Sequence, residues 1–470
     1  MGANWRIWVD TGGTFTDGLA VDPDGRWRRV KVLSSSALRG RIEARLDGPS
    51  YRVAQSWRAP DDFVRGFRCK LLGRAHPGRR VEAFDAARSV LTLDAPLPDG
   101  LEPGASFEVV SDEEAPVLAA RLATGTPAGA PLPSLDLRLA TTKGTNALLE
   151  RKGAPTALFV TKGFKDLLAI GTQARPDLFA LEVKKPPPLY EAVVEVDERI
   201  DAEGAVLRPI DLDGLDDALA ELRARGIRSA AVALLHSYRN PAHEEALGRR
   251  LAEHGFRTVS LSARLSRFIK ILPRAETALV NAYLQPIIED YLDAVQTRMT
   301  DGRLFVMTSA GGLVRRERFA PKDSLLSGPA GGVVGAATVG REEGIDRVIS
   351  FDMGGTSTDV ARYDGDYEYV FEHQVGDAHL VAPALAIETV AAGGGSICAF
   401  DGHALGVGPE SAGAFPGPAC YGAGGPLTVT DVNLLLGRLD PLNFSIPVAL
   451  DAARRELNAV VDRVASAAGE

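Results

Sequence analysis

A short polar motif occurs twice in this chain of 470 residues and limits its fold more than any other feature. The motif reads DTGGTFTD from Asp10 to Asp17 and recurs as DMGGTSTD from Asp352 to Asp359, with six of eight positions identical. In both copies an apolar segment runs into the first Asp, and a second apolar segment follows the last one. Each copy therefore predicts a β-hairpin with a Gly-Gly-Thr turn.

Such a turn suits phosphate binding. It exposes consecutive backbone N–H groups, and the glycines place no Cβ in the way of the ligand. The P-loop and the Rossmann fingerprint both place a helix after their glycines, so neither motif fits. Two turns from two halves of the chain predict a clamp on the phosphates of one nucleotide. Mg²⁺ prefers oxygen ligands, and the carboxylates of Asp10 and Asp352 are placed to hold it. The alternative interpretation is two Gly-rich hairpins whose Thr and Asp side chains only cap the turns.

The region from about 37 to 110 has a different pattern from the rest of the chain. Short apolar segments recur there between clusters of Gly, Pro and Asp. This pattern predicts a small all-β module that is compatible with a barrel.

After this region, strands and helices alternate. Continuous apolar runs at 155–161 and 229–235 predict buried strands, and helical periodicity at 212–226 and 275–298 predicts helices. Because proline lacks the backbone N–H, the second helix is expected to be kinked or restarted at Pro286. The alternation predicts the α/β class.

Three further Gly-rich stretches, at 327–332, 391–396 and 422–426, predict tight turns. Gly393 to Ser396 forms a secondary candidate for the active-site cleft.

Composition excludes several classes of protein. Apolar residues make up 45% and charged residues 24%, which is typical of globular proteins. The net charge of −9, without a Lys/Arg-dense stretch, argues against a nucleic-acid partner. No run of about 18 apolar residues predicts a membrane span, and the first residues do not resemble a signal peptide. Cys69, Cys398 and Cys420 are far apart and leave at least one thiol unpaired, which favours reduced, buried thiols and a cytoplasmic location.

Two other groups of polar residues predict weaker sites. Glu372, His373, Asp377 and His379 are all potential metal ligands, but their spacing on an undefined loop is weak evidence for a metal. His243 opens an HEEAL segment that lacks the second His of a zinc-protease helix. A loop followed by a helix N-terminus is the better prediction there.

Several sequence blocks, in this order, resemble the hydantoinase/oxoprolinase family, specifically its A-type chains. The blocks are VDTGGTFTD at 9–17, TTKGTNALLERKG at 141–153, NAYLQP at 281–286, LLSGPAGGVVGA at 325–336, SFDMGGTSTDVA at 350–361, AAGGGSI at 391–397 and PLTVTDVNLLLGRL at 426–439. They span nearly the whole chain, and the 37–110 module is the part that they cover least.

The resemblance implies a duplicated ribonuclease-H-like α/β fold of the actin and sugar-kinase superfamily, with ATP between the halves and the β-module as an insertion. The expected domains are an N-terminal region at 1–220 and an A-type catalytic region at 221–470. Asp10 and Asp352 are implied as catalytic and metal-binding residues. The implied nucleotide-binding residues are Thr11, Gly12, Gly13, Thr14, Thr16, Gly354, Gly355, Thr356, Thr358, Gly394 and Gly395.

Members of this family open cyclic amides such as 5-oxoproline, hydantoins and lactams by phosphorylating the amide oxygen. ATP and Mg²⁺ are therefore the implied cofactors, and a B-type subunit or fused B region is the implied partner. Many relatives continue past residue 470, so the chain is expected to be a fragment. The alternatives are a ketone carboxylase component, a small-molecule kinase and a non-catalytic ATP-binding scaffold. Lys143 and Glu388 depart from the family pattern, and Lys143 is expected to be a solvated loop charge.

Overall fold

The first hairpin lies in the middle of a large mixed sheet. The computed structural model describes residues 4–73, 77–101, 103–172, 179–182, 184–444 and 446–469. The predicted meander is confirmed as β1 (Trp5–Thr11), β2 (Phe15–Val21) and β3 (Trp27–Leu33). On the side of β1 opposite to β2, the sheet continues with β10 (Leu135–Thr141), β17 (Gly302–Met307) and β18 (Leu313–Arg315). Helix α1 (Ala115–Thr124) packs on the face that carries the buried Ile7 and Val9.

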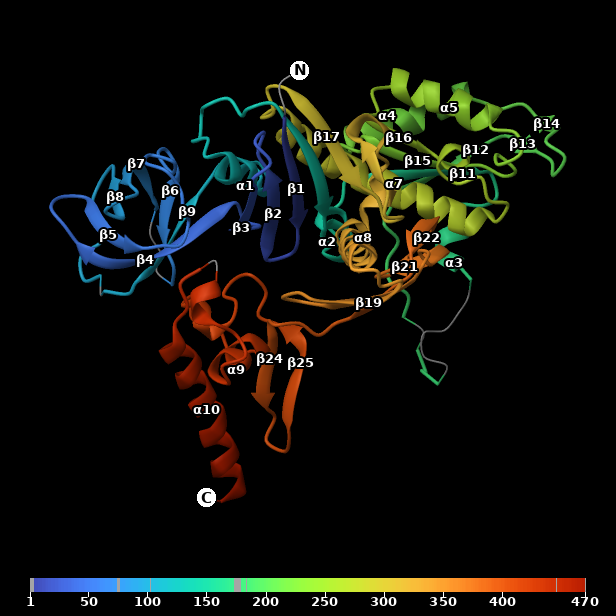
Figure 1. The fold of residues 1–470 in the computed structure, drawn as a ribbon. Helices are drawn as coiled ribbons and strands as arrows, with labels where there is room; N and C mark the ends of the chain where they lie inside the picture. Colours follow the sequence, from blue (N-terminus) through green and yellow to red (C-terminus); the bar gives the residue numbers. More distant parts are fainter. Residues whose placement is uncertain are drawn as a thin grey trace.

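The predicted β-module is confirmed, and it closes into a barrel. Its strands are β4 (Ala37–Arg45), β5 (Ser50–Ala54), β6 (Arg68–Leu71), β7 (Arg79–Asp85), β8 (Val90–Leu93) and β9 (Ser106–Val110). They pair in the order β4-β5-β8-β7-β6-β9, and β9 pairs again with β4. Trp57 fills the interior against Phe84 and Phe107, with ring centroids 5.5 and 6.0 Å apart. The barrel forms the blue lobe of Figure 1, beside the first hairpin.

A second layer is built on a parallel sheet, as the alternating pattern predicts. The strands are β11 (Thr156–Thr161), β12 (Ala192–Val196), β15 (Ser229–Ala233) and β16 (Thr258–Leu261), in the order β12-β11-β15-β16. The helices include α4 (Asp216–Ala224), α5 (Ala242–Glu253) and α7 (Ile271–Gln296). Helix α7 is one continuous element, so a restart at Pro286 is wrong. Packing of α7 against strands of both halves outweighs the hydrogen bond that proline cannot donate.

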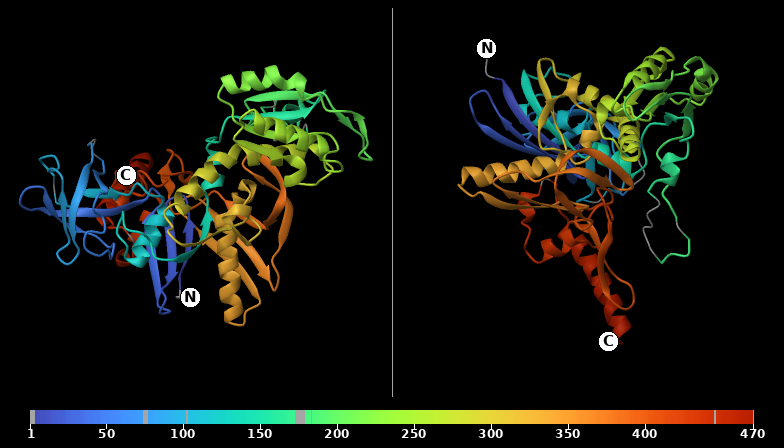
Figure 2. Two further views of the ribbon diagram at one scale, coloured as in Figure 1. Left: turned by 90° about the horizontal axis from the view of Figure 1, so that it is seen from above. Right: turned by 90° about the vertical axis from the view of Figure 1, so that its right-hand side faces the viewer.

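The second hairpin belongs to a smaller sheet in the C-terminal half. Strands β19 (Arg347–Met353), β20 (Thr358–Asp364) and β23 (Ile387–Val390) pair antiparallel. Helix α8 (Ser327–Glu342) lies along them, as Figure 2 shows. The stretch 327–332, predicted as a tight turn, is the start of this helix, so that prediction is wrong. The glycines of this stretch have no side chain, so the helix packs closely against strand β10.

The remaining elements complete the two halves. They are α2 (Lys143–Leu149), α3 (Leu167–Ile170), β13 (Arg199–Ile200), β14 (Val206–Arg208), α6 (Ser262–Leu265), β21 (Tyr369–Val375), β22 (Ala378–Leu385), β24 (Ser396–Phe400), β25 (Leu405–Ser411), α9 (Val429–Leu435) and α10 (Leu450–Ala468). Helix α10 projects from the body of the molecule (Figure 1). Within the described ranges, none of the helices combines the length and apolarity needed to cross a membrane.

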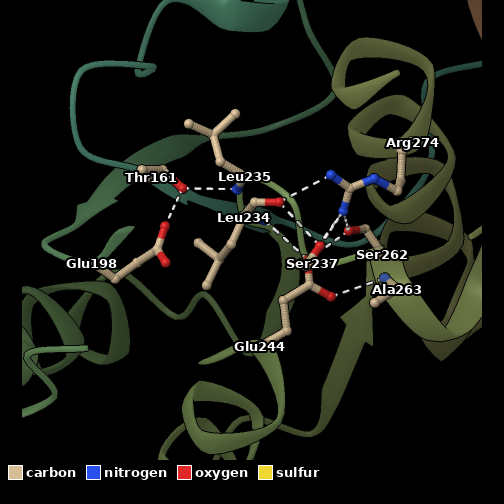
Figure 3. A network of polar contacts seen from close by, with 9 residues as sticks. All are labelled: Thr161, Glu198, Leu234, Leu235, Ser237, Glu244, Ser262, Ala263 and Arg274. Atoms are coloured by element: carbon tan, nitrogen blue, oxygen red, sulfur yellow. Dashed lines mark hydrogen bonds and ion pairs between the residues drawn. The ribbon is translucent and has the colours of Figure 1, made fainter. Parts of the chain in front are cut away.

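A buried ion pair joins helix α7 to helix α5 (Figure 3). The side chains of Arg274 and Glu244 are both fully buried, and Arg274 Nη1 lies 3.5 Å from Glu244 Oε1. Glu244 also accepts hydrogen bonds from the hydroxyls of Ser237 and Ser262, at 2.8 and 2.6 Å. His243, at the start of α5, contacts Glu198 at 2.7 Å. The predicted helix N-terminus at HEEAL is thus confirmed, and its polar residues hold the layer together.

Candidate active site

The two GGT turns have the same hydrogen-bonded conformation. In the first, Gly12 N donates to Phe15 O at 3.0 Å, and in the second, Gly354 N donates to Ser357 O at 2.9 Å. The sequence repeat is therefore also a structural repeat, which confirms the two predicted strand–turn–strand units.

Each turn leaves backbone donors available to a ligand. Across the described part of the chain, the N–H groups of Gly13, Thr14, Gly355 and Thr356 donate to no protein acceptor. Consecutive free N–H groups in a turn form a positively polarised concavity that suits phosphate oxygens.

The first turn is held by the start of the barrel connection. Ser34 Oγ donates to Gly12 O at 2.8 Å, and Ser34 N donates to Thr14 O at 3.0 Å. The hydroxyl of Thr16 lies 3.0 Å from that of Ser34, and Thr11 is buried. Thr11, Thr14 and Thr16 are the threonines predicted to bind nucleotide at this turn. The contact of Thr16 with Ser34 helps to hold the turn. Ser34 is a residue that sequence reasoning missed, because it lies outside the repeated motif.

The second turn is held by the Gly-rich stretch at 391–396. Gly394 N donates to Gly354 O at 2.9 Å, and Gly395 N donates to Gly355 O at 2.7 Å. Thr358 Oγ1 donates to Ala392 O at 2.6 Å, which fixes the strand that follows the turn. Gly394 and Gly395 therefore act here as supports for the turn.

The two turns meet, and their carboxylates lie beside the same helix, α8. A methyl group built on Gly355 would lie 2.9 Å from Thr14 Oγ1, so the tips of the turns are in contact. Methyl groups built on Gly328 and Gly332 would lie 3.3 Å from Asp10 Oδ1 and 3.6 Å from Asp352 Oδ2. These glycines are four positions apart on one helix, a rise of about 6 Å. The predicted pair of metal ligands, Asp10 and Asp352, is thus brought to one place from positions distant in sequence.

Negative charge accumulates around Asp10. The pKa of Asp10 is raised to about 6, chiefly by burial and in addition by the nearby carboxylates of Asp17, Asp352 and Asp359, whereas Lys31 lowers it. The side chain of Asp10 nevertheless remains accessible to solvent. Lys31 Nζ is 2.6 Å from Asp17 Oδ2. A cation would relieve this repulsion, which is a physical reason for a metal at the site.

The donor set fits Mg²⁺ better than a transition metal. Within the described ranges, no three His, Cys, Asp or Glu side chains are close enough to share an ion. Mg²⁺ keeps several waters and needs only one or two carboxylates, as Asp10 and Asp352 offer. The weaker candidate on β21 and β22 forms no metal site: Glu372 pairs with Lys270, and Asp377 pairs with Arg151.

A cavity of about 1080 Å³ opens beside the carboxylates of Asp10 and Asp17. Its lining includes Asp10, Asp17 and Lys31, Gly332 of α8 and Trp57 of the barrel. The cavity provides room for an organic molecule next to the turns.

Lys143 is exposed, with its ammonium 5.3 Å from the Tyr291 ring centroid.

Replacement of Asp10 by Asn is expected to stabilise the metal-free protein at neutral pH. The raised pKa means that ionisation of Asp10 is less favourable in the folded than in the unfolded chain. This penalty is absent below the ordinary aspartate pKa of 3.8, grows as pH rises, and is complete above about 6. The melting temperature of Asp10→Asn should therefore exceed that of the parent by an amount that grows between pH 4 and 6 and then stays constant. An equal difference at all pH values would contradict the assignment.

Replacement of Gly393 by Ala is expected to distort the second turn. The new methyl group would lie 2.7 Å from the backbone carbonyl of Gly355, and no side-chain rotation relieves a clash with backbone. Overpacking of this kind costs about 1–3 kcal/mol of unfolding free energy. Thermal melts should show this loss in Gly393→Ala but not in Gly335→Ala, whose methyl group meets nothing within 4 Å. Equal melting temperatures for the two variants would show that the turn tolerates the methyl group.

Two family models match the chain. The hydantoinase/oxoprolinase N-terminal region matches residues 99–255, and hydantoinase/oxoprolinase matches residues 274–469. 5-Oxoprolinase 1 of Arabidopsis thaliana is 50% identical over 332 residues, which cover 66% of this chain and 26% of that protein. The chain thus spans about a quarter of the length of this relative.

Two solved structures share the fold over 98% of the chain. Nucleotide-free acetone carboxylase has a TM-score of 0.67 at 22% identity, with 59% of its chain covered. The ATP-dependent caprolactamase of Pseudomonas jessenii has a TM-score of 0.61 at 26% identity, with 58% covered. The twin turns, their paired carboxylates and these matches agree that the chain belongs to the hydantoinase/oxoprolinase family.

Proposed function

We propose that the chain is the ATP-binding part of an ATP-dependent cyclic amidohydrolase, acting on 5-oxoproline, a hydantoin or a lactam. The observation that carries the proposal is the pair of equivalent turns in contact, with free N–H groups and with Asp10 and Asp352 beside the same helix. Family membership supports it, because 5-oxoprolinase 1 and the caprolactamase bear names of this chemistry. Within this proposal, the halves correspond to duplicated ribonuclease-H-like domains at 1–220 and 221–470.

The chain's own residues provide the positioning that phosphoryl transfer requires. The N–H groups of Gly13, Thr14, Gly355 and Thr356 bind phosphate oxygens, with hydroxyl donors from Thr14 and Thr356. The carboxylates of Asp10 and Asp352 hold Mg²⁺, directly or through water. When bound, Mg²⁺ neutralises charge on the β- and γ-phosphates.

The reaction activates a carbonyl that water attacks slowly. The amide oxygen attacks the γ-phosphorus, the bond to the β-phosphate oxygen breaks, and ADP leaves with that electron pair. The ring then carries an imidate phosphate. Water adds to its carbon, and collapse of the adduct breaks the ring carbon–nitrogen bond, with the nitrogen taking a proton and the carbon retaining the phosphate as an acyl phosphate. A second water hydrolyses the acyl phosphate, which releases inorganic phosphate and yields the open-chain amino acid or its carbamoyl derivative.

We propose that a B-type subunit or fused B region completes the enzyme. The chain spans about a quarter of 5-oxoprolinase 1 and 58% of the caprolactamase chain, so related proteins carry much more polypeptide. The cytoplasmic location stays a prediction.

The test is ATP hydrolysis by the chain together with a B-type partner, with 5-oxoproline, hydantoin or caprolactam added separately. The expected result is ADP and ring-opened product in equal amounts, only with one of these substrates. ADP formation that requires a ketone and bicarbonate would identify a carboxylase component instead. A stable phosphorylated product would identify a kinase, and Mg·ATP binding without turnover would identify a scaffold.

A further inference from the structure

Residues 393–431, here called the clasp, contact both phosphate turns. The clasp comprises the glycines of the stretch at 391–396, the β24–β25 hairpin, the loop that leads into α9 and the first residues of α9. It lies between the second hairpin and the barrel in Figure 1.

One end of the clasp is bound to the second turn. Gly394 and Gly395 donate to the carbonyls of Gly354 and Gly355. Thr430, from the first turn of α9, fixes Gly394 in place: its backbone N and its Oγ1 both donate to Gly394 O at 2.8 Å.

The other end of the clasp packs against the first turn. Tyr421 meets Phe15 edge to face, with ring centroids 6.1 Å apart and ring planes at 75°. Phe15 directly follows Thr14 and accepts the hydrogen bond from Gly12 that closes the turn. Arg39 of the barrel also contacts Tyr421. Its guanidinium lies 5.9 Å from the ring centroid and donates a hydrogen bond to Tyr421 O at 3.5 Å.

Asp431 links these two ends. Its fully buried carboxylate accepts hydrogen bonds from Ala419 N at 3.1 Å and Cys420 N at 2.7 Å, next to Tyr421. It also accepts from Thr428 N and Thr428 Oγ1, both at 2.8 Å, two residues before Thr430. Within the described ranges this carboxylate has no cationic partner, and its four hydrogen-bond donors form a rigid node, because Cys420 N and Thr428 N would otherwise be left without an acceptor.

We propose that Asp431 is a positioning residue that fixes the spacing of the two phosphate turns from outside the nucleotide site. The path runs through Tyr421 to Phe15 on one side and through Thr430 and Gly394 to Gly354 on the other. The barrel takes part through Arg39, which holds Tyr421 in place. The consequence for nucleotide affinity rests on the proposed function, whereas the mechanical link between the turns does not.

The test compares Asp431→Asn with Asp462→Asn, an exposed control on α10. Asn keeps the shape, but its amide nitrogen cannot accept a hydrogen bond, so at least one buried donor loses its partner. Hydrogen exchange in the nucleotide-free protein should accelerate at 12–15 and 354–357, although neither segment contacts Asp431 directly. Mg·ATP should bind roughly tenfold more weakly, which is the effect of losing one to two buried hydrogen bonds. Faster exchange confined to 419–436, with both turns unchanged, would overturn the proposal.

Two milder variants separate the ends and apply even if Asp431→Asn does not fold. Thr430→Val removes one hydrogen bond to Gly394 and should accelerate exchange only at 354–357. Tyr421→Leu removes the ring contact with Phe15 and should accelerate exchange only at 12–15. Unchanged exchange at the respective turn in both variants would refute the link. If the parent binds no Mg·ATP, the proposed function fails, while the exchange results still decide the role of Asp431.

Discussion

Replacement of Asp352 by Asn should abolish Mg²⁺-dependent nucleotide binding while leaving the fold intact. Asp352 is exposed at the end of β19 and faces the cleft rather than a core, so the loss of its charge removes no packing. Together with Asp10 it provides the only pair of carboxylates that the repeated motif places at the ends of incoming strands. Substitution of a residue that only supports a metal ligand changes metal affinity by about 10- to 100-fold. Loss of a ligand itself should have a larger effect, so we expect at least a hundredfold loss of Mg·ATP affinity.

Calorimetric titration of Mg·ATP measures this effect directly. Asp364→Asn is the matched control, because Asp364 is exposed on the neighbouring strand β20 and pairs only with Arg347 at the far end of the hairpin. Circular dichroism should show the same fold for both variants. If Asp352→Asn binds Mg·ATP as tightly as the control does, the clamp between the turns is the wrong interpretation.

Replacement of Glu244 by Gln should strongly destabilise the protein. The substitution leaves the fully buried guanidinium of Arg274 without a counter-charge (Figure 3). Burial already lowers the pKa of Arg274, and Glu244 counteracts that effect. Removal of one partner of a buried ion pair costs about 3–5 kcal/mol of unfolding free energy.

Chemical denaturation measures this loss, and the adjacent residue is its control. Glu245 is partly exposed and lies 3.5 Å from Arg264, so Glu245→Gln should change the unfolding free energy by less than about 1 kcal/mol. A similar small effect of Glu244→Gln would mean that the hydroxyls of Ser237 and Ser262 suffice to hold Arg274. The reverse change, Arg274→Met, should be as damaging, because it leaves the carboxylate buried without its cation.

Local sequence pattern was sufficient for the elements that carry the candidate site. The Gly-Gly-Thr repeat identified both hairpins, because a turn of this kind is closed by hydrogen bonds between residues three apart. Apolar runs identified β11 and β15, and the turn-rich stretch at 37–110 identified the barrel. Local pattern misled at 327–332, where glycines serve close packing of a helix, and at Pro286, where tertiary contacts keep α7 continuous.

The sequence by itself determined that two equivalent Gly-Gly-Thr turns exist and that their carboxylates lie at the ends of strands, because these are properties of residues next to each other in the chain. Only the tertiary structure decided that the turns meet, that Ser34 and Gly394 hold them from behind, and that Asp431 connects their supports. The physical reason is that these contacts join segments separated by tens to hundreds of residues. Their geometry is set by how α8, the barrel and the clasp pack together, and no local pattern encodes that packing.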